Sequence, residues 1–416
     1  MNLLSRFFLA GAVPTCVWLA GVALAAPQAA SQAAGSKSAV SKSGRSQAVG
    51  SQTKGPISDV VFKNVRALKG IPVDDFMGTM GIMSAAVGYD CSECHIGAGT
   101  DKVDWAADNP KKVMARKMVT MVTTINHDNF AGRQVVTCWS CHHGRDRPST
   151  TPAMETVYGP ASLEMDDFLP QAPGQPPADQ IIDKYLDAIG GATKLATLKS
   201  YVATGTSIGF GGFGGGGKVQ IFAKFPDQRT TLIQFEAATG RTDSVRTYNG
   251  RVGWIKTPLA VLADYELTGG ELDGARIDAE LSFPSQIKQV LTSLRVSLPT
   301  MISDLPGPSS QTSNQSAAAP VQDRVVNVLQ GSGPRGLLAN LYFDQQTGLL
   351  LRTIRYGKTP IGRVPTQVDY ADYRDVGGIK IPFRLTFAWL DGRDVIQLSD
   401  VQTNVPIDAA KFNRPK

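Results

Sequence analysis

Two copies of the pentapeptide Cys-x-x-Cys-His constrain this chain more than any other feature. The first copy, in "DCSECHIG", spans residues 91–95, and the second, in "TCWSCHHGR", spans residues 138–142. The chain has five cysteines and four histidines, so the two copies use most of the cysteines and half of the histidines. The side chains that they contribute are Cys91, Cys94, His95, Cys138, Cys141 and His142. A fold of this chain must therefore provide two similar local sites.

The spacing within each copy has a chemical reason. Two thiols one short turn apart can each form a thioether bond with a porphyrin vinyl group, and the imidazole that follows can bind the iron as its proximal ligand. A single copy could arise by chance, but two copies that use every cysteine except Cys16 are a specific signal. We therefore expect two covalently bound haem c groups, one at each pentapeptide.

The four cysteines have two alternative uses. They could bind one structural zinc ion or form two redox-active disulfides. The two pairs are separated by 43 residues, longer than the usual spacing of a zinc ribbon. Both alternatives also leave the adjacent histidines without a role. Of the other histidines, we expect His143 to be exposed and His127 to lie near a helix end. A role for His127 as a partner of an iron ligand, or as a replacement axial ligand, is the alternative.

The N-terminus has the pattern of a secretory signal peptide. One positive charge at Arg6 precedes an apolar stretch that ends in small residues, which predicts a signal peptide at 1–25. Cys16 lies inside this stretch and would be removed with it. An uncleaved N-terminal anchor is the alternative, because the stretch is long enough for one. Residues 26–57 are rich in Ser, Ala, Gly and Gln and predict a flexible leader. We expect the mature protein on the periplasmic or extracellular side of a bacterial envelope.

Methionines precede each pentapeptide at helical spacing and are candidates for the sixth iron ligand. Asp74 or Asp75 can cap the first helix, and Asn109 can cap the second, with Pro110 at its first position. A methionine paired with histidine raises the potential of a haem into the range of electron carriers. A methionine stripe is also a common form of core packing, which is the alternative. The methionines are Met77, Met80 and Met83 in the first segment, and Met114, Met118 and Met121 in the second.

Gly78 and Gly81 interrupt the first of these helices. Glycine destabilises a helix interior, so we expect it where another group approaches closely. A flat porphyrin lying against the helix would be such a group.

The segments "GIPVDDFMGTMGIMSAAVGYDCSECH", "VMARKMVTMVTTIN" and "VVTCWSCHHGRDRP" together resemble a two-haem unit of the cytochrome subunit of photosynthetic reaction centres, over about residues 58–150. The resemblance implies that Met80 pairs with His95 at the first haem, with Met77 as the fallback. It also implies that Met118 pairs with His142 at the second. That family usually carries four haems in two such units, whereas this chain has one unit. The resemblance therefore extends to the haem unit and puts a role at a photosynthetic centre in doubt.

The second half of the chain predicts a separate β domain. A Pro-rich connection at 151–177 is followed by a helical pattern that ends at Gly190-Gly191, and then by alternating β-prone segments with a hairpin signal at Asn249-Gly250. About nine or ten antiparallel strands with helices at one side predict a curved sheet or open barrel over 178–416, with a mobile loop at about 304–323. The outline weakly resembles the lipoprotein-carrier family. The fold class is therefore α+β and multidomain, with a small α-helical di-haem domain first.

Charge and composition limit the function of the chain. Five positive charges of the formal +6 precede the first acidic residue, Asp59, so no basic face for nucleic acid is visible. The half after residue 150 contains no cysteine and no histidine, which excludes thiol- or histidine-based catalysis there, and its other polar residues form no recognisable constellation.

We therefore expect an electron carrier between redox proteins of the cell envelope, rather than an enzyme that converts a substrate. The β domain would dock a partner or hold an apolar ligand, and a scaffold that only positions the haems is the other possibility for it. The alternatives for the whole chain are a di-haem peroxidase-like enzyme, and a lipid or lipoprotein carrier with a redox-sensing haem domain.

Overall fold

This computed structural model describes residues 55–415, apart from residues 99, 101, 159–169, 210–215, 236–242, 258–261, 263, 304–322 and 391. The predicted signal peptide, nearly all of the predicted leader and nearly all of the predicted mobile loop lie outside these described residues. Within them, no helix combines the length and the apolar character needed to cross a membrane.

The first pentapeptide follows a helix of four turns. The chain forms α1 (Ser58–Val61), α2 (Val73–Val87) and α3 (Cys91–Cys94). The expectation that Asp74 or Asp75 caps α2 is wrong, because the cap position is Pro72 and no side chain caps the helix there. The Asp74 carboxylate instead accepts hydrogen bonds from Thr268, far along the chain.

The second pentapeptide follows a longer helix whose start agrees with the prediction. It is preceded by α4 (Pro110–Phe130), forms α5 (Cys138–His142), and is followed by α6 (Met154–Tyr158). The Asn109 side chain accepts a hydrogen bond from the backbone of Lys112 at 2.9 Å, and Pro110 occupies the first helical position. Since proline has no N–H to lose there, both residues favour a helix that begins at this point.

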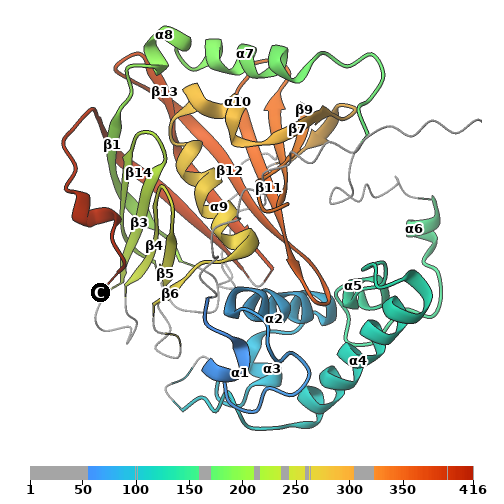
Figure 1. Ribbon diagram of the computed structural model, residues 1–416. Coiled ribbons are helices and arrows are strands. Elements are labelled where there is room, and N and C mark those ends of the chain that lie inside the picture. Colours follow the sequence, from blue (N-terminus) through green and yellow to red (C-terminus); the bar gives the residue numbers. More distant parts are fainter. Residues whose placement is uncertain are drawn as a thin grey trace, which may run out of the picture. The chain divides into compact units, whose positions relative to one another are not determined.

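The rest of the chain forms one open, curved antiparallel sheet, which confirms the predicted α+β class (Figure 1). Fourteen strands are seen among the described residues, more than the nine or ten expected, because short strands such as β6 and β8 carry too little pattern to predict. Their order is β6-β5-β4-β3-β2-β1-β14-β13-β12-β11-β10-β9-β7, with β8 paired to β9. The strands are β1 (Ser200–Ser207), β2 (Gly217–Lys224), β3 (Gln228–Phe235), β4 (Ser244–Asn249), β5 (Gly253–Lys256), β6 (Tyr265–Glu266), β7 (Thr292–Val296), β8 (Thr300–Ile302), β9 (Arg324–Ser332), β10 (Leu338–Asp344), β11 (Leu350–Thr359), β12 (Gly362–Val376), β13 (Ile379–Trp389) and β14 (Gly392–Thr403).

The predicted hairpin at Asn249-Gly250 is confirmed between β4 and β5. The Asn249 side chain accepts hydrogen bonds from the backbone of Arg251 and Val252, and Gly250 has a φ of 94°. A positive φ of this size favours glycine, which explains the residue found there.

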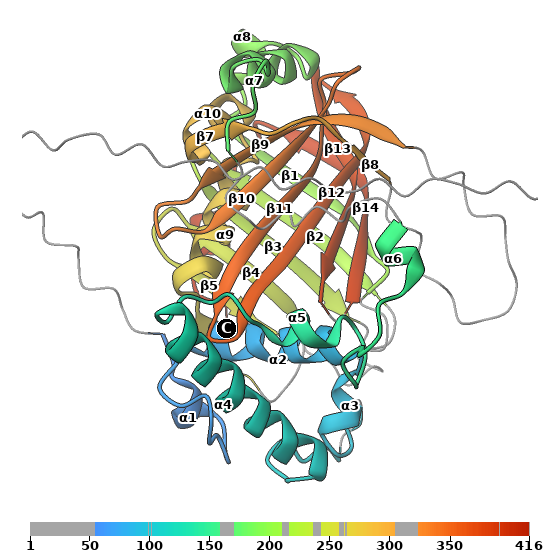
Figure 2. The same ribbon diagram turned by 90° about the vertical axis from the view of Figure 1, so that its right-hand side faces the viewer.

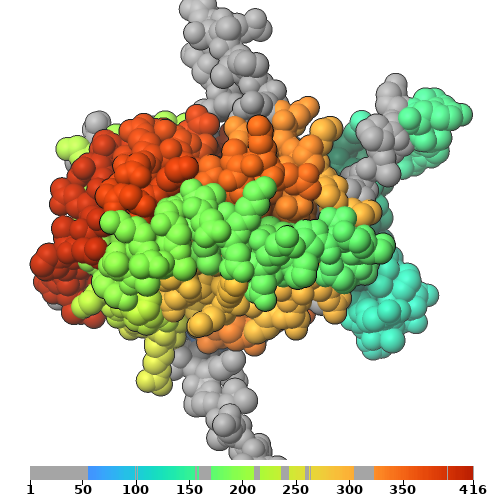
Figure 3. Space-filling view, turned by 90° about the horizontal axis from the view of Figure 1, so that it is seen from above, coloured from blue at the N-terminus to red at the C-terminus, as the bar shows by residue number. Residues whose placement is uncertain are grey.

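Helices cover one end and the hollow of the sheet. They are α7 (Ala178–Ala188), α8 (Ala192–Leu195), α9 (Gly269–Glu280) and α10 (Ile287–Val290), with short 3-10 turns at Pro284–Gln286 and Ala409–Phe412. Figure 2 shows α9 inside the curve, with β3 and β4 on one side and β10 and β11 on the other. Seen from above in Figure 3, α7 and α8 (green) lie across the end of the sheet, between the C-terminal strands in red and orange and the yellow α9–α10 region.

Two apolar clusters hold these layers together. The larger joins α7, in which Ile182 is fully buried, and the following Ile189 to the inward side chains of the strands. The smaller joins α2 to the turn between β11 and β12, where Ile82 packs near Ile361 and Val364. Residues Thr53–Lys416 form one compact unit, and the domain boundaries expected from the sequence stay predictions.

Candidate functional site

The first pentapeptide forms a single helical turn with its histidine directly after it. The Asp90 side chain accepts a hydrogen bond from the backbone of Ser92 at 2.8 Å and so caps α3. The Asn109 side chain donates a hydrogen bond to the carbonyl of Cys94 at 2.8 Å, which ties the start of α4 to the first pentapeptide. Cys91 and Cys94 thus stand three residues apart on one helical face, both half-buried.

The His95 ring is held in a neutral, metal-binding form. Burial lowers the pKa of His95, Lys112 lowers it further, and only the nearby backbone of Trp105 opposes them. The ring packs against the indole of Trp105, with centroids 5.1 Å apart. Its Nδ1 is buried without a well-formed hydrogen bond among the described residues. A metal-binding imidazole must be neutral, so these surroundings suit a ligand.

The second pentapeptide repeats this arrangement with its own cap. Thr137 and Ser140 bond reciprocally at the start of α5, which fixes the turn that carries the cysteines. Cys138 is buried, which raises its pKa, whereas Cys141 is exposed. The Nδ1 atom of His142 lies 2.9 Å from the carbonyl oxygen of Arg145. With a proton on Nδ1, this contact leaves Nε2 with the lone pair that binds a metal.

These geometries fit covalently attached haem. In both pentapeptides the cysteines stand one helical turn apart and the histidine follows directly, with His142 Nδ1 beside the carbonyl oxygen of Arg145. Among the described residues, no three side chains of His, Cys, Asp or Glu are placed to hold one metal ion together, so the two cysteine pairs lie at separate places.

The methionines of α2 face different surroundings. Met80 and Met83 pack against the cluster that contains Cys138, Ile82 and Ala86. Met77, the fallback ligand, lines the cavity of the sheet instead. Only Met80 and Met83 therefore lie beside a pentapeptide cysteine in this cluster.

The methionines of α4 differ in exposure. Met118 is half-buried next to the fully packed Val119, whereas Met114 and Met121 expose 52% and 42% of their surface. Met118 is therefore the methionine of this helix that a buried group would contact most readily.

The two pentapeptides are interleaved with the methionine helices. The backbone N–H of Gly144, just after α5, donates to the carbonyl of Ala86 in α2 at 2.9 Å. At the other site, Lys111 of α4 forms an ion pair with Glu93 of α3. Each pentapeptide therefore contacts the helix that precedes the other one.

The two remaining histidines lie on the surface. His127 is in the last turn of α4, as expected, with an exposed ring 2.7 Å from the Asp128 carboxylate. His143 is exposed at the end of α5 and stacks on Trp139.

The glycines of α2 allow a close approach, but the partner is the sheet rather than a porphyrin. A Cβ atom at Gly81 would lie 2.7 Å from the Trp389 ring, and one at Gly78 would lie 3.0 Å from Thr359. The expectation of a close approach is therefore met by β11 and β13.

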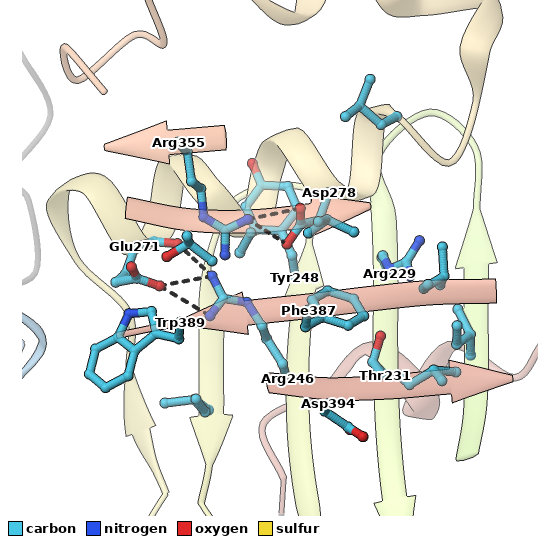
Figure 4. Close-up of a pocket in the computed structure, with 18 of the residues that line it drawn as sticks. Arg229, Thr231, Arg246, Tyr248, Glu271, Asp278, Arg355, Phe387, Trp389 and Asp394 are labelled. Atoms are coloured by element: carbon cyan, nitrogen blue, oxygen red, sulfur yellow. Dashed lines mark hydrogen bonds and ion pairs between the residues drawn. The ribbon is translucent and has the colours of Figure 1, made fainter. Parts of the chain in front are cut away.

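The hollow of the sheet holds a cavity of about 550 Å³, shown in Figure 4. It is crossed by two ion pairs that anchor α9. Arg246 of β4 donates to Glu271 at 3.1 Å, and Arg355 of β11 donates to Asp278 at 3.0 Å. Desolvation raises the pKa of Glu271, but Arg246 and Arg355 outweigh it and hold the pKa below its usual value. Glu271 therefore stays ionised at neutral pH.

The helix α2 closes one end of this cavity through Asp74. Thr268 donates to Asp74 Oδ2 from its backbone N–H at 2.7 Å and from its hydroxyl at 3.1 Å. The other oxygen, Oδ1, is buried without a hydrogen-bond partner among the described residues. Burial, and then the charge of Glu271, raise the pKa of Asp74 to about 7.

The charged residues of the cavity were missed in the sequence because they come from segments far apart. The sequence signal for them is their position within a strand, because every second side chain of a strand points to the same face. Arg229 shares a face of β3 with Ile233, and Arg246 shares a face of β4 with Tyr248, so each charge occupies an inward position.

Comparison with known proteins agrees with the predicted resemblance of the first part of the chain. Residues 19–164 match the model of the family described as photosynthetic reaction centre cytochrome C subunit. The photosynthetic reaction center cytochrome c subunit of Thermochromatium tepidum is 32% identical over 103 residues. The match covers 24% of this chain and 24% of that relative, so it spans about a quarter of the length of the relative.

Solved structures resemble this chain at a low level. A LolA superfamily protein from Nitrosomonas europaea is 14% identical with a TM-score of 0.36, covering 57% of this chain and 98% of that one. A DUF1329 family protein from Desulfovibrio piger is 13% identical with the same TM-score and coverage. A putative outer membrane lipoprotein-sorting protein domain from Vibrio parahaemolyticus is 11% identical with a TM-score of 0.33, covering 56% and 97%.

Proposed function

We propose that this chain is an exported c-type cytochrome with two haems, which transfers single electrons between redox proteins of the bacterial envelope. The observation that carries the proposal is the repeated helical turn in which two cysteines stand three residues apart and a histidine follows directly. The match of residues 19–164 to a cytochrome c subunit family supports a multihaem cytochrome. The haem unit would occupy residues 58–150, joined through 151–177 to the β domain at 178–416.

The residues have distinct roles in this proposal. The cysteine pairs would attach the porphyrins, His95 and His142 would bind the irons from one side, and Met80 and Met118 from the other. A bound haem supplies one-electron redox chemistry, whereas the protein sets its potential through the axial ligands and through burial. The carbonyl of Arg145 would hold the His142 ring in the required tautomer.

The proposal is tested by counting haems on the mature protein. Expression with haem-attachment machinery should yield two haems per chain that survive denaturation and acid-acetone extraction. The paired changes Cys91→Ala/Cys94→Ala and Cys138→Ala/Cys141→Ala should each remove one of them. A mass equal to that of the bare polypeptide, or zinc in place of iron, would contradict the proposal.

The cavity supports a second role for the β domain as the holder of an apolar ligand. Its walls are largely apolar, and its volume lies within the range of small-molecule sites. A β domain that served only as a scaffold for the haems would have no need of this cavity. Analysis of material that co-purifies with the holoprotein should detect a bound apolar compound, and a docking-only role predicts none.

A further inference from the structure

Three arginines line the cavity, and one of them differs from the other two in its partners. Arg246 and Arg355 are each paired with a carboxylate of α9, as the dashed lines in Figure 4 show. Arg229 of β3 donates only to two neutral hydroxyls, those of Tyr201 at 3.0 Å and Ser282 at 2.7 Å. In the part of the chain that the structure describes, no carboxylate lies within ion-pair distance of Arg229.

An unpaired cation beside apolar walls is unfavourable unless something compensates its charge. Removing a charge from water costs free energy that only a partner of opposite sign offsets in full. The two hydroxyls satisfy part of the hydrogen-bonding capacity of Arg229 but none of its charge. Its Nε and Nη2 atoms have no hydrogen-bond partner among the described residues. This edge of the guanidinium is therefore available to an anion.

A long apolar path leads away from Arg229 through the cavity. Thr231, Ile233 and Phe235 follow it on the same face of β3. Six residues of strand from Arg229 to Phe235 extend about 20 Å. Apolar side chains of β12, β13 and β14 also line the cavity, namely Val368, Leu385, Phe387, Ile396 and Leu398.

The charges of the cavity fix the direction of a ligand in this path. The far end is closed by α2 and carries acidic groups, Asp74, Asp75 and Asp394, whose pKa values are all raised first by burial. Burial disfavours negative charge at that end, whereas Arg229 offers an anion a positive partner. A polar head at Arg229 and an apolar tail toward α2 is the orientation that suits both ends.

We propose that the cavity binds a single-chain amphiphile with a carboxylate head, a long-chain fatty acid, whose head pairs with Arg229. A planar guanidinium edge matches the two oxygens of a carboxylate, and the Tyr201 hydroxyl, which accepts from Arg229, stands beside it as a further donor. Of the three cavity arginines, Arg229 is the one without a carboxylate partner in the described part of the chain, which suits a monoanion. The inference deepens the ligand-binding part of the proposed function and is independent of haem attachment.

The test is equilibrium dialysis of the purified holoprotein against radiolabelled hexadecanoate and, separately, methyl hexadecanoate. The two probes share a chain and differ in charge, so the comparison needs no substitution. The acid should bind saturably at one site, and the ester at least tenfold more weakly. Arg229→Gln should weaken the acid at least tenfold and leave the ester unchanged. Ile233→Trp, which fills the path of the chain, should weaken both.

Arg384→Gln is the matched control, because Arg384 lies on the same sheet but is exposed outside the cavity. It should bind both probes like the unchanged protein. Equal affinity for acid and ester, an unchanged Arg229→Gln variant, or no saturable binding would each overturn the proposal. Haem content measured on the same samples keeps this result separate from the electron-carrier function, since loss of haem with intact acid binding would count only against the latter.

Discussion

Gly81 of α2 lies directly against the indole ring of Trp389 of β13, so that a Cβ atom at Gly81 would come within 2.7 Å of the ring. The helix that precedes the first pentapeptide is thus seated on the β sheet at a position where only glycine fits. Glycine in a helix interior is less favourable than alanine by about 1 kcal/mol. The close contact explains why glycine is nevertheless present.

Replacing Gly81 by alanine should destabilise the protein by about 1–3 kcal/mol, although alanine is the better helix former, because the added methyl group overpacks against the ring. Urea unfolding monitored by circular dichroism measures the change. The double variant Gly81→Ala/Trp389→Phe has a smaller ring at the contact and should recover part of the loss. A Gly81→Ala variant that is more stable than the parent would show that the contact is not limiting.

Asp74 should make stability depend on pH. Its pKa is raised from 3.8 to about 7 in the fold by burial and by Glu271, while Thr268 and Arg246 oppose the rise and Tyr265 packs nearby. Between these two pKa values, the folded state keeps a proton on Asp74 that the unfolded chain releases, and this proton binding stabilises the fold. This contribution is present below about pH 4 and is lost as the pH rises to about 7.

The variant Asp74→Asn should remove this loss. The free energy of unfolding of the variant, relative to that of the parent, should increase as the pH rises from 4.5 to 7.5. The increase should be up to about 4 kcal/mol for a pKa shift of this size. Urea unfolding at the two pH values provides the measurement. Asp59→Asn is the control, because a hydrogen bond from Gly70 lowers the pKa of this exposed carboxylate, so its removal should add almost no pH dependence over this range. A parallel pH dependence of parent and Asp74→Asn would refute the assignment.

Changing Met80 or Met118 to alanine should each lower one haem midpoint potential and open that iron to added ligands. Loss of a thioether ligand moves the potential by a substantial part of the roughly 0.8 V that axial ligands span. Redox titration of the holoprotein measures both potentials. Since each pentapeptide contacts the helix that precedes the other one, the haem that responds also identifies the histidine with which the methionine pairs.

Met83→Ala and Met121→Ala serve as controls on the same two helices. They should leave both potentials close to those of the parent. Unchanged spectra and potentials in Met80→Ala and Met118→Ala would rule out both as ligands.

The ion pair between Arg355 and Asp278 should be worth more than an exposed pair on the same sheet. Arg355 is only 8% exposed, so Asp278→Asn would leave a buried cation without its carboxylate and should cost about 3–5 kcal/mol. Asp372 and Arg374 form a largely exposed pair, and Asp372→Asn should therefore cost much less. Equal losses in denaturant unfolding of the two variants would contradict this difference.

Local features of the site were predictable because they depend on residues a few positions apart. The helix start at Asn109 and Pro110 and the turn at Asn249-Gly250 follow from capping and backbone preferences of the residues themselves. The spacing within each pentapeptide likewise specifies one helical turn. The strand count and the cap of α2 were wrong, since both depend on pairing with distant segments.

The sequence by itself determined the two pentapeptides, the helices that lead into them and the alternation of the main strands. Tertiary structure alone decided that Gly81 meets Trp389, that Asp74 binds Thr268, and that Arg229 enters a largely apolar cavity where no described carboxylate pairs with it. The reason is physical. Helical turns and caps are set by neighbouring residues, whereas burial and charge pairing are set by the register of strands that the chain brings together from far apart.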